Sequence, residues 1–335
     1  MCITSDLLVK TSKGIYCPKG DFYIDPVRAV KLALISHGHA DHAKSGHGHF
    51  HCTDATGTIL DRRLNQSDCT THAWEESFEI NGVKISFHPA GHVLGSAQIR
   101  LESEGKVWVF SGDYKRQADS SCEPFRLVPC DVFITEATFA LPVYQWKNPE
   151  EVFTEIHEWV TQNQKQNLNS VLLAYSLGKA QRLLTGLLPY QKEPIWVHKS
   201  IEEMNQCYSK HGVQLPLTSP IKEWKKLSPY PTGQLIILPQ AGLTDDLVDR
   251  LGPHRIASAS GWNMVQNAKK RVGPTNGFVV SDHVDWPDLV QTIRETGAKR
   301  VWVTHGQNRS FARYLRECEG VDAIAWEDLE NDARG

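Results

Sequence analysis

Short apolar runs recur along the 335-residue chain, and polar segments containing glycine follow most of them. Their length and their content of branched residues predict buried strands. The expected strands are 31–36, 83–90, 106–114, 131–139, 170–176, 194–198, 234–240, 254–262, 277–286 and 300–306. Helix-like periodicity covers 149–165, 177–188 and 287–297. Strands that alternate with helices predict an α/β or a layered αββα protein.

The stretch 146–274 differs from the sequence on either side of it. It is rich in helix-like segments, lysine and glutamine, and it holds no cluster of potential metal ligands. We interpret it as a second domain, which leaves residues 1–145 and 275–335 for the first. A chain of 335 residues is long enough to bury the cores of two domains.

Composition narrows the class of protein. Apolar residues make up 40% and charged residues 22% of the chain, as in ordinary soluble globular proteins. No run of eighteen apolar residues and no signal-peptide core occurs, so we expect a cytoplasmic protein without a membrane span. The eight cysteines form no CxxC pair and are expected to be free thiols. A net charge of −3 means that any site for a polyanion must be local.

The most informative segment is ISHGHADHAKSG, which follows an apolar run and contains His37, His39, Asp41 and His42. In an extended loop alternate side chains point the same way, so the first three converge and His42 lies one step round. Imidazole and carboxylate without cysteine suit zinc, manganese or iron in an open hydrolytic site. The alternative is a chance cluster among fifteen histidines. We favour the metal site because the segment directly follows a buried strand.

Three further histidines, His47, His49 and His51, alternate just downstream. No carboxylate accompanies them, and GHGHFHC also fits a strand with one polar and one apolar face. We therefore favour a structural role for these three residues.

Three later positions supply the ligand types that a second metal ion would need. His92 follows a turn of small residues, while Asp113 and His305 each follow an apolar strand. Asp113 is expected to bridge both ions. The first expected set of ligands is His37, His39, His92 and Asp113, and the second is Asp41, His42, His305 and Asp113. Two ions ~3.5–4 Å apart suit the transition state of phosphoryl transfer.

The order of the motifs ISHGHADH, AGHVLGSA, SGDY, TEATF, SDHVDW and THGQN resembles the metallo-β-lactamase superfamily, in particular its β-CASP nuclease branch. The resemblance extends over nearly the whole chain, from Asp25 in FYIDP to His305. The segment AGHVLGSAQIRLE and the compact size are most similar to the bacterial DNA-ligase-associated exonucleases. The resemblance implies an αββα metallo-β-lactamase sandwich in two parts, 1–145 and 275–335, with a β-CASP domain at 146–274.

The resemblance also implies roles for residues outside the ligand sets. Asp25 is expected to support the metal-binding histidines on the side away from the metal, since the nitrogen of a ligand imidazole that does not bind the metal needs a hydrogen-bond partner. His283 of SDHVDW resembles the general acid that protonates the departing oxygen, and Glu136 of TEATF resembles the residue that holds it. Asp41 is counted with these two as catalytic. The alternative for His283 is a loop histidine with its hydrogen bonds satisfied.

Three residues of the middle domain are expected to bind substrate. Ser176 and Lys179 lie where a strand passes into a helix, and they could hold a phosphate there. The alternative for this pair is ordinary helix capping. Trp262 lies in ASGWN, which resembles a loop motif of the DNA-directed relatives, and it could stack on a base. The alternative for Trp262 is core packing.

The function that the resemblance implies is a two-metal-dependent DNA exonuclease, acting in DNA repair together with a DNA ligase and a helicase. One alternative is an RNA-processing endo- or exoribonuclease, because His305 is typical of RNA-directed members whereas the SGW loop favours DNA. A small-molecule metallo-hydrolase or an inactive binding subunit are further alternatives. The sequence leaves open the native metal (Zn²⁺ or Mn²⁺), the cleavage polarity, the balance of exo- and endonuclease action and the oligomeric state.

Overall fold

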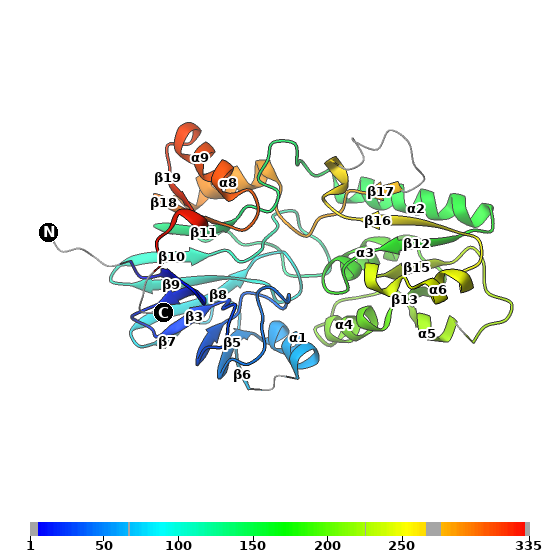
Figure 1. The fold of residues 1–335 in the computed structure, drawn as a ribbon, viewed down its shortest axis with the longest axis horizontal. Helices are drawn as coiled ribbons and strands as arrows, with labels where there is room; N and C mark the ends of the chain where they lie inside the picture. Colours follow the sequence, from blue (N-terminus) through cyan, green and yellow to red (C-terminus); the bar gives the residue numbers. More distant parts are fainter. Residues whose placement is uncertain (1–5, 66–67, 225, 266–275, 332–335) are drawn as a thin grey trace. The chain divides into compact units, whose positions relative to one another are not determined.

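The computed structural model describes residues 6–65, 68–224, 226–265 and 276–331 (Figure 1). Contacts between residues divide the chain into two compact units. Unit 1 is Met1–Ala118, Cys122–Pro142 and His283–Gly335, and unit 2 is Asp119–Ser121 and Val143–Asp282. The middle of the sequence therefore forms a unit of its own.

The end of unit 2 differs from the expected boundary between residues 274 and 275, which lies outside the described residues. The structure keeps the chain in unit 2 as far as Asp282. The reason is strand β17 (Asn276–Phe278), which pairs in parallel with β16 (His254–Ala259) of the same unit. The short segment Asp119–Ser121 also belongs to unit 2, which hydrophobic periodicity did not indicate.

Unit 1 contains two sheets among its described residues. The first has the order β1-β2-β3-β4-β5-β6 and the second β19-β18-β11-β10-β9-β8-β7. The strands of the first sheet are β1 (Val9–Thr11), β2 (Gly14–Cys17), β3 (Phe22–Ile24), β4 (Leu32–Leu34), β5 (His49–Thr53) and β6 (Cys69–His72). The strands of the second are β7 (Phe78–Ile80), β8 (Val83–Pro89), β9 (Ala97–Ser103), β10 (Lys106–Phe110), β11 (Val132–Glu136), β18 (Arg300–Thr304) and β19 (Asp322–Ala325).

The two sheets pack face to face, and helices cover both outer faces (Figure 1). Between the sheets lie side chains such as Phe22 and Leu34 from one sheet and Phe110 from the other. Helix α1 (Asp54–Leu64) packs on the first sheet, and α8 (Trp286–Thr296) with α9 (Asn308–Cys318) packs on the second. The 3₁₀ helix η3 (Trp326–Asp328) follows β19. This is the αββα sandwich that the sequence predicted.

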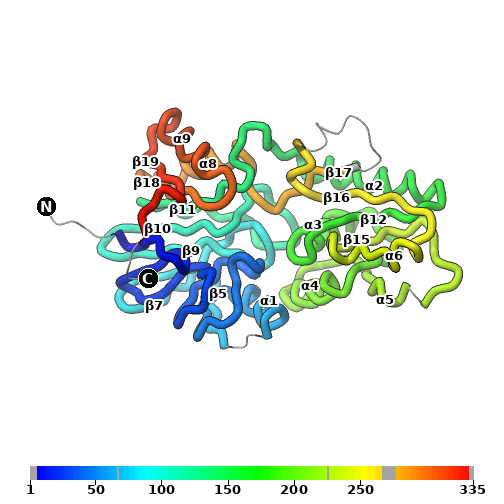
Figure 2. Tube along the Cα trace, viewed as in Figure 1, coloured from blue at the N-terminus to red at the C-terminus, as the bar shows by residue number. Residues whose placement is uncertain are grey.

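Unit 2 is built on one parallel sheet, whose described strands have the order β14-β13-β15-β12-β16-β17. Figure 2 labels β15, β12, β16 and β17 of this sheet. Apolar side chains of α2, α3 and α4 cover one face, and those of α5 and α6 cover the other. The remaining elements are β12 (Asn169–Leu173), β13 (Ile195–Val197), β14 (Thr218–Pro220), β15 (Leu235–Leu238), α2 (Pro149–Lys165), α3 (Lys179–Leu187), α4 (Lys199–Lys210), α5 (Ile221–Trp224), α6 (Asp245–Arg250), η1 (Leu188–Tyr190) and η2 (Gln240–Gly242).

Helix α2 shows why its range was predictable from the sequence. Asn148 caps its first turn by accepting a hydrogen bond from the Glu150 amide, and Pro149 occupies the first helical position. Glutamates in the first turn and Lys165 in the last turn complement the helix dipole. Helices α3 and α8 also lie close to their predicted ranges.

Within the described ranges, every helix is too short or too polar to span a lipid bilayer.

Candidate metal centre

The HGHADH segment forms the turn that follows β4. The Ile35 amide donates to the His51 carbonyl, which keeps the start of the segment aligned with β5. The amides of His42 and Ala43 both donate to the His39 carbonyl and so close the turn. His37 and His42 are buried, His39 is half-buried and Asp41 is exposed. The turn therefore directs two imidazoles inward and leaves one carboxylate at the rim.

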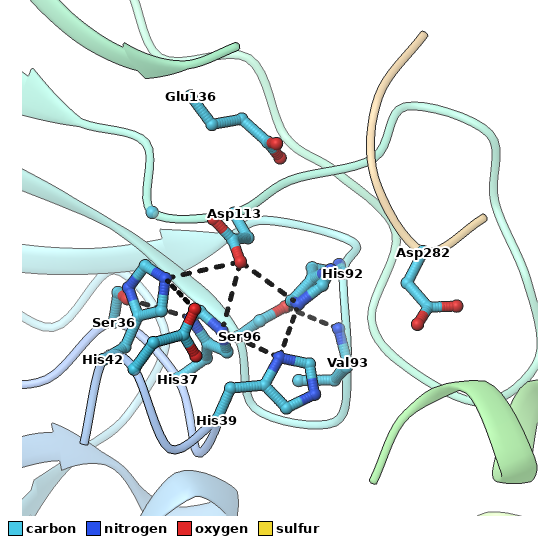
Figure 3. Close-up of polar contacts among 12 residues, drawn as sticks. Ser36, His37, His39, His42, His92, Val93, Ser96, Asp113, Glu136 and Asp282 are labelled. Carbon is cyan, nitrogen blue, oxygen red and sulfur yellow. Dashed lines mark hydrogen bonds and ion pairs between the residues drawn. The ribbon is translucent and has the colours of Figure 1, made fainter. Parts of the chain in front are cut away.

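His37, His39, His92 and Asp113 each offer one ligand atom within 4.8 Å of the others (Figure 3). Nδ1 of His39 lies 3.1 Å from Nε2 of His37 and 3.0 Å from Nε2 of His92. Oδ2 of Asp113 lies 3.5 Å from Nε2 of His37 and 3.7 Å from Nε2 of His92. The structure thus brings together the whole first ligand set, from three separate loops.

Asp25 fixes which nitrogen of His42 faces this cluster. Its Oδ2 accepts a hydrogen bond of 2.7 Å from Nδ1 of His42 and another from the Ser36 hydroxyl, while Oδ1 accepts from the Ser36 amide. Because Nδ1 carries the proton, the neutral imidazole presents the lone pair of Nε2 to the centre. Asp25 thus has the supporting geometry that was expected of it.

Nε2 of His42 is the observation that tests whether these residues suit a cation. It is buried and has no hydrogen-bond partner among the described residues. It faces Oδ2 of Asp113 at 3.4 Å, so a lone pair and a carboxylate oxygen point at each other. This arrangement is repulsive unless positive charge lies between the two atoms. The residues therefore fit a divalent cation.

The pKa shifts in the cluster also indicate that positive charge is favoured there. Burial lowers the pKa of His42, but Asp113 and Asp25 outweigh it and hold that pKa well above the usual value. Burial and the neighbouring His42 keep the pKa of His37 well below its usual value. Burial alone would raise the pKa of Asp113, yet the histidines around it, His42 first, keep it well below its usual value. A proton on His42 supplies charge that a bound cation would replace.

The second expected ligand set is gathered less tightly around Asp113. Nε2 of His42 is 3.8 Å from Oδ2 of Asp41, whose side chain is 71% exposed. The rings of His42 and His305 have centroids 5.3 Å apart. His305 is exposed and has a backbone φ of 53°, a left-handed conformation that is costly for a histidine. His42 and Asp113 thus form the centre of this set, and Asp41 and His305 lie at its edge.

Two glycines allow the ligands to approach one another. Gly91 and Gly112 precede His92 and Asp113, with φ of 74° and 56°. A Cβ atom on Gly91 would lie 2.3 Å from the Lys115 carbonyl oxygen, and one on Gly112 would lie 2.9 Å from the Ser36 side chain. Only glycine therefore fits at either position.

Glu136 and His283 form a pair beside Asp113. Glu136, the buried last residue of β11, accepts a 2.8 Å hydrogen bond from the Tyr114 amide through Oε1. Its Oε2 lies 2.8 Å from Nδ1 of His283. Ligand-type atoms of Asp113, Glu136 and His283 all lie within 4.8 Å of one another. The half-buried His283 thus has the orientation expected of it, with Nε2 on the side of the ring away from Glu136.

The three expected substrate-binding residues lie in unit 2. The Ser176 hydroxyl is 2.6 Å from that of Ser200, and buried Lys179 forms an ion pair with Asp282. The cap of α3 is Gly178, so neither residue caps this helix. Trp262 is 44% exposed and packs edge-on against Tyr144, with ring centroids 5.8 Å apart. Roles in substrate binding stay predictions for all three.

The histidines just downstream of the motif have contacts within the protein. Nδ1 of His47 accepts from the Val30 amide, and His49 lies within hydrogen-bond distance of Asp68 and Thr70. In the part of the chain that the structure describes, none of these histidines belongs to a group that could hold a metal.

Sequence reasoning missed Arg63 of α1. Its Nη1 donates a hydrogen bond to the carbonyl of Gly38, the residue between His37 and His39. Burial lowers the pKa of Arg63, while the charge of Asp41 acts in the opposite direction. No signal in the sequence distinguishes this arginine from Arg62, which precedes it.

Comparison with known proteins identifies the family. A family model described as "Beta-lactamase superfamily domain" matches residues 11–171, which include His37, His39, His92 and Asp113. Residues 11–171 thus contain a metallo-β-lactamase superfamily domain. A domain of this superfamily implies divalent cations, usually zinc, and the cluster around Asp113 offers suitable donors.

Proteins that are similar to this chain have different names. The chain is 30% identical over 320 residues to a "Probable DNA ligase" of Opitutus terrae, covering 95% of the chain and 31% of that protein. It is 33% identical to cleavage and polyadenylation specificity factor subunit 3 of Dictyostelium discoideum, over 39% of the chain and 17% of that protein. It is 32% identical to endoribonuclease YSH1 of Kluyveromyces lactis, over 35% of the chain and 15% of that protein. The chain thus spans less than a third of each relative's length.

Proposed function

We propose that this chain is a two-metal-dependent exonuclease that hydrolyses phosphodiester bonds in DNA. The observation that carries the proposal is the position of Asp113. It faces a cluster of imidazoles on one side and the His283–Glu136 pair on the other. A carboxylate that lies among potential metal ligands and next to a potential proton donor suits hydrolysis of a phosphodiester.

In this proposal the ligands divide as the sequence analysis expected. His37, His39 and His92 would hold one ion, and His42 with Asp41 and His305 would hold the other, while Asp113 would serve as a ligand in both sets. Bound cations would lower the pKa of a water molecule and offset the charge of the phosphate. Asp25 keeps the proton of His42 on Nδ1 and so leaves Nε2 to act as a ligand.

His283 acts as the general acid on the leaving oxygen. Glu136 accepts from Nδ1 of His283, which fixes the ring and stabilises its protonated form. The proton on Nε2 is then available to the oxygen that leaves the phosphorus atom. Histidine suits this role because its usual pKa lies near neutral pH. Tyr114 keeps Glu136 in place through its backbone amide.

DNA is the preferred substrate in this proposal because of how the relatives cover the chain. The relative named as a probable DNA ligase matches 95% of the chain, including nearly all of both units. A domain of this kind beside ligase activity suits the trimming of DNA ends before they are joined. We therefore propose a DNA ligase as functional partner, while the helicase named in the sequence analysis stays a prediction.

RNA is the second candidate substrate, and a specific observation supports it. The relatives of Dictyostelium discoideum and Kluyveromyces lactis have names that refer to RNA processing, and each matches more than a third of the chain. His305, which the resemblance associates with RNA-directed members, lies beside His42.

The test is digestion of matched single-stranded deoxy- and ribo-oligonucleotides, labelled at either end, with Zn²⁺ or Mn²⁺. The wild type should shorten the DNA stepwise from one end, and Asp113→Ala should abolish cleavage. His49→Ala is the matched control, because His49 belongs to unit 1 and its contacts lie away from the cluster. It should retain the wild-type rate.

Each alternative has its own outcome in this assay. Cleavage of RNA but not DNA would replace the proposed substrate with the second candidate. Turnover of a lactone or thioester without cleavage of either polymer would favour a small-molecule hydrolase. Metal binding without turnover of any substrate would indicate a binding subunit.

A further inference from the structure

Helix α3 carries two buried cations one turn apart. Nζ of Lys179 lies 3.5 Å from Oδ2 of Asp282, and Nη1 of Arg182 lies 3.2 Å from Oδ2 of Asp119. The exposed fractions of these four side chains are only 4–7%. Lys179 also lies over the ring of Tyr175, 5.4 Å from its centroid. All of these residues belong to unit 2.

Burial makes this group of charges costly, so each ion needs its partner. Moving a charge out of water costs several kcal/mol, and removing one partner leaves the other uncompensated. Burial raises the pKa of Asp119 to about 6, and nearby Asp282 adds to the shift, although hydrogen bonds from Ser121 oppose it. Burial also lowers the pKa of Arg182 to about 10. Apolar side chains at these positions of α3 would pack in the core of unit 2 without these costs. A contribution to stability therefore does not by itself explain why charged residues are present there.

The positions of the two carboxylates in the chain suggest what the charges do. Asp119 follows Asp113 by six positions and lies in the short segment that joins unit 2. Asp282 is the last residue of unit 2 and directly precedes His283. Each carboxylate therefore lies where the chain passes between the units, next to a segment of the proposed active site.

The residue on the other side of His283 is also fixed. The Val284 amide donates a 2.7 Å hydrogen bond to the carbonyl of Tyr114, whose own amide donates to Glu136. The backbone of His283 is thus held at both neighbours, by the ion pair at Asp282 and by the hydrogen bond at Val284. A general acid has to be placed to within a fraction of an ångström, since a misplacement of about 1 Å can cost ~10²-fold in rate.

We propose that Lys179 and Arg182 are positioning residues, through which α3 fixes the chain segments that lead from Asp113 and into His283. This inference rests on the proposed function, because it assigns His283 its role as proton donor. It also gives Lys179 a role other than the phosphate contact that the sequence suggested. The ammonium group of Lys179 fixes Asp282 from inside unit 2.

The first test measures catalysis on two substrates in Lys179→Met, Arg182→Met and Asp282→Asn. On an oligonucleotide, whose leaving oxygen needs a proton, we expect kcat to fall about 10- to 100-fold with little change in KM. On a phosphodiester with a p-nitrophenolate leaving group, which needs no proton, kcat should fall less than threefold. Equal losses on both substrates would indicate general damage to the enzyme and would overturn the proposal.

Two further variants control for charge. Lys199→Met is the matched control, because Lys199 is also the first residue of a helix in unit 2 but pairs with Glu203 through a side chain that is 79% exposed. It should leave kcat within about twofold of the wild type. Arg182→Lys keeps the positive charge and should retain more activity than Arg182→Met. If Arg182→Lys lost as much as Arg182→Met, the charge would not be the cause.

A second readout does not depend on nuclease activity. Hydrogen exchange of the Val284 amide should be at least tenfold faster in Lys179→Met and Asp282→Asn than in the wild type or Lys199→Met. If the wild type cleaves no nucleic acid, the proposed function fails, while this exchange still tests the anchoring of the segment. If Lys179→Met does not fold, the nearly isosteric Asp282→Asn decides. Unchanged Val284 exchange in a folded variant would overturn the proposal.

Discussion

Both units bury ionisable side chains, but they arrange them in opposite ways. In unit 1, Nε2 of His42 faces a carboxylate oxygen of Asp113 at 3.4 Å and has no hydrogen-bond partner among the described residues. In unit 2, Lys179 and Arg182 face Asp282 and Asp119, so that opposite charges meet. The first arrangement is repulsive unless positive charge enters it, whereas in the second each charge already faces an opposite charge. A ligand site is therefore recognised by groups that repel one another, and not by the number of buried polar residues.

The largest expected effect comes from removing the central carboxylate of the candidate metal centre in unit 1. Asp113→Ala removes the carboxylate that faces both histidine groups, and we expect its activity to fall by about 10³-fold or more, because metal-ion stabilisation is worth several kcal/mol. Metal content, measured by elemental analysis, should fall in the same variant.

The matched variant in the ion pairs of unit 2 is Asp119→Asn. It removes a buried carboxylate of unit 2, and its metal content should equal that of the wild type. If Asp119→Asn lost metal as Asp113→Ala does, the contrast between the two units would be wrong.

The next effect concerns the proton donor. His283→Ala should lower kcat by about 10²-fold, the lower range for general acid catalysis, while metal content stays at the wild-type level. Glu136→Gln should lower kcat in the same direction, since it weakens the acceptor that holds Nδ1. The measurement is steady-state cleavage of a labelled oligonucleotide together with elemental analysis. Full activity of His283→Ala would remove the proposed acid.

A smaller effect, on metal affinity, is expected from the residue that holds His42. Asp25→Asn replaces the acceptor of the His42 and Ser36 hydrogen bonds, and metal affinity should fall about 10- to 100-fold. Competition with a chromophoric chelator measures this affinity. Asp21→Asn is a suitable control, because Asp21 is an exposed carboxylate on the same part of the chain that bonds only the Tyr16 hydroxyl among the side chains described. Equal affinities of Asp25→Asn and Asp21→Asn would contradict the support assigned to Asp25.

The smallest expected effect is a pH dependence of the free energy of unfolding that comes from Asp119 in unit 2. Burial raises the pKa of Asp119 from 3.8 to about 6, so the folded chain holds this proton to higher pH than the unfolded chain. This contribution to the free energy of unfolding is fully present below about pH 4 and is lost as the pH rises through about 6, by roughly 2–3 kcal/mol. Urea unfolding of the wild type and Asp119→Asn at several pH values measures it. A constant difference between the two proteins from pH 4 to 7 would refute it.

Most residues of the candidate site could be predicted from the sequence, because they follow predicted strands in the chain. A ligand that comes directly after an apolar run must lie at a strand end, as Asp113 does after β10, and loops at one end of a sheet lie close together. The αββα class and the range of α2 followed from periodicity and capping in the same way. These are local signals.

Features that depend on tertiary contacts were not predictable. Arg63 looks like any helical arginine, and only the fold brings it to the Gly38 carbonyl. The ion pairs of Lys179 and Arg182 join residues that are 103 and 63 positions from their partners. The run 277–286 was expected to be one strand, but β17 ends at Phe278 and the chain leaves unit 2 after Asp282. No local pattern encodes such partners.

The most direct test of the central claim is an anomalous diffraction map of a crystal grown with excess Zn²⁺, recorded at the zinc edge. The account predicts two peaks ~3.5–4 Å apart. The Asp113 carboxylate should lie between them, with His37, His39 and His92 on one ion and His42 on the other. A single peak, or two peaks that Asp113 does not contact, would contradict it.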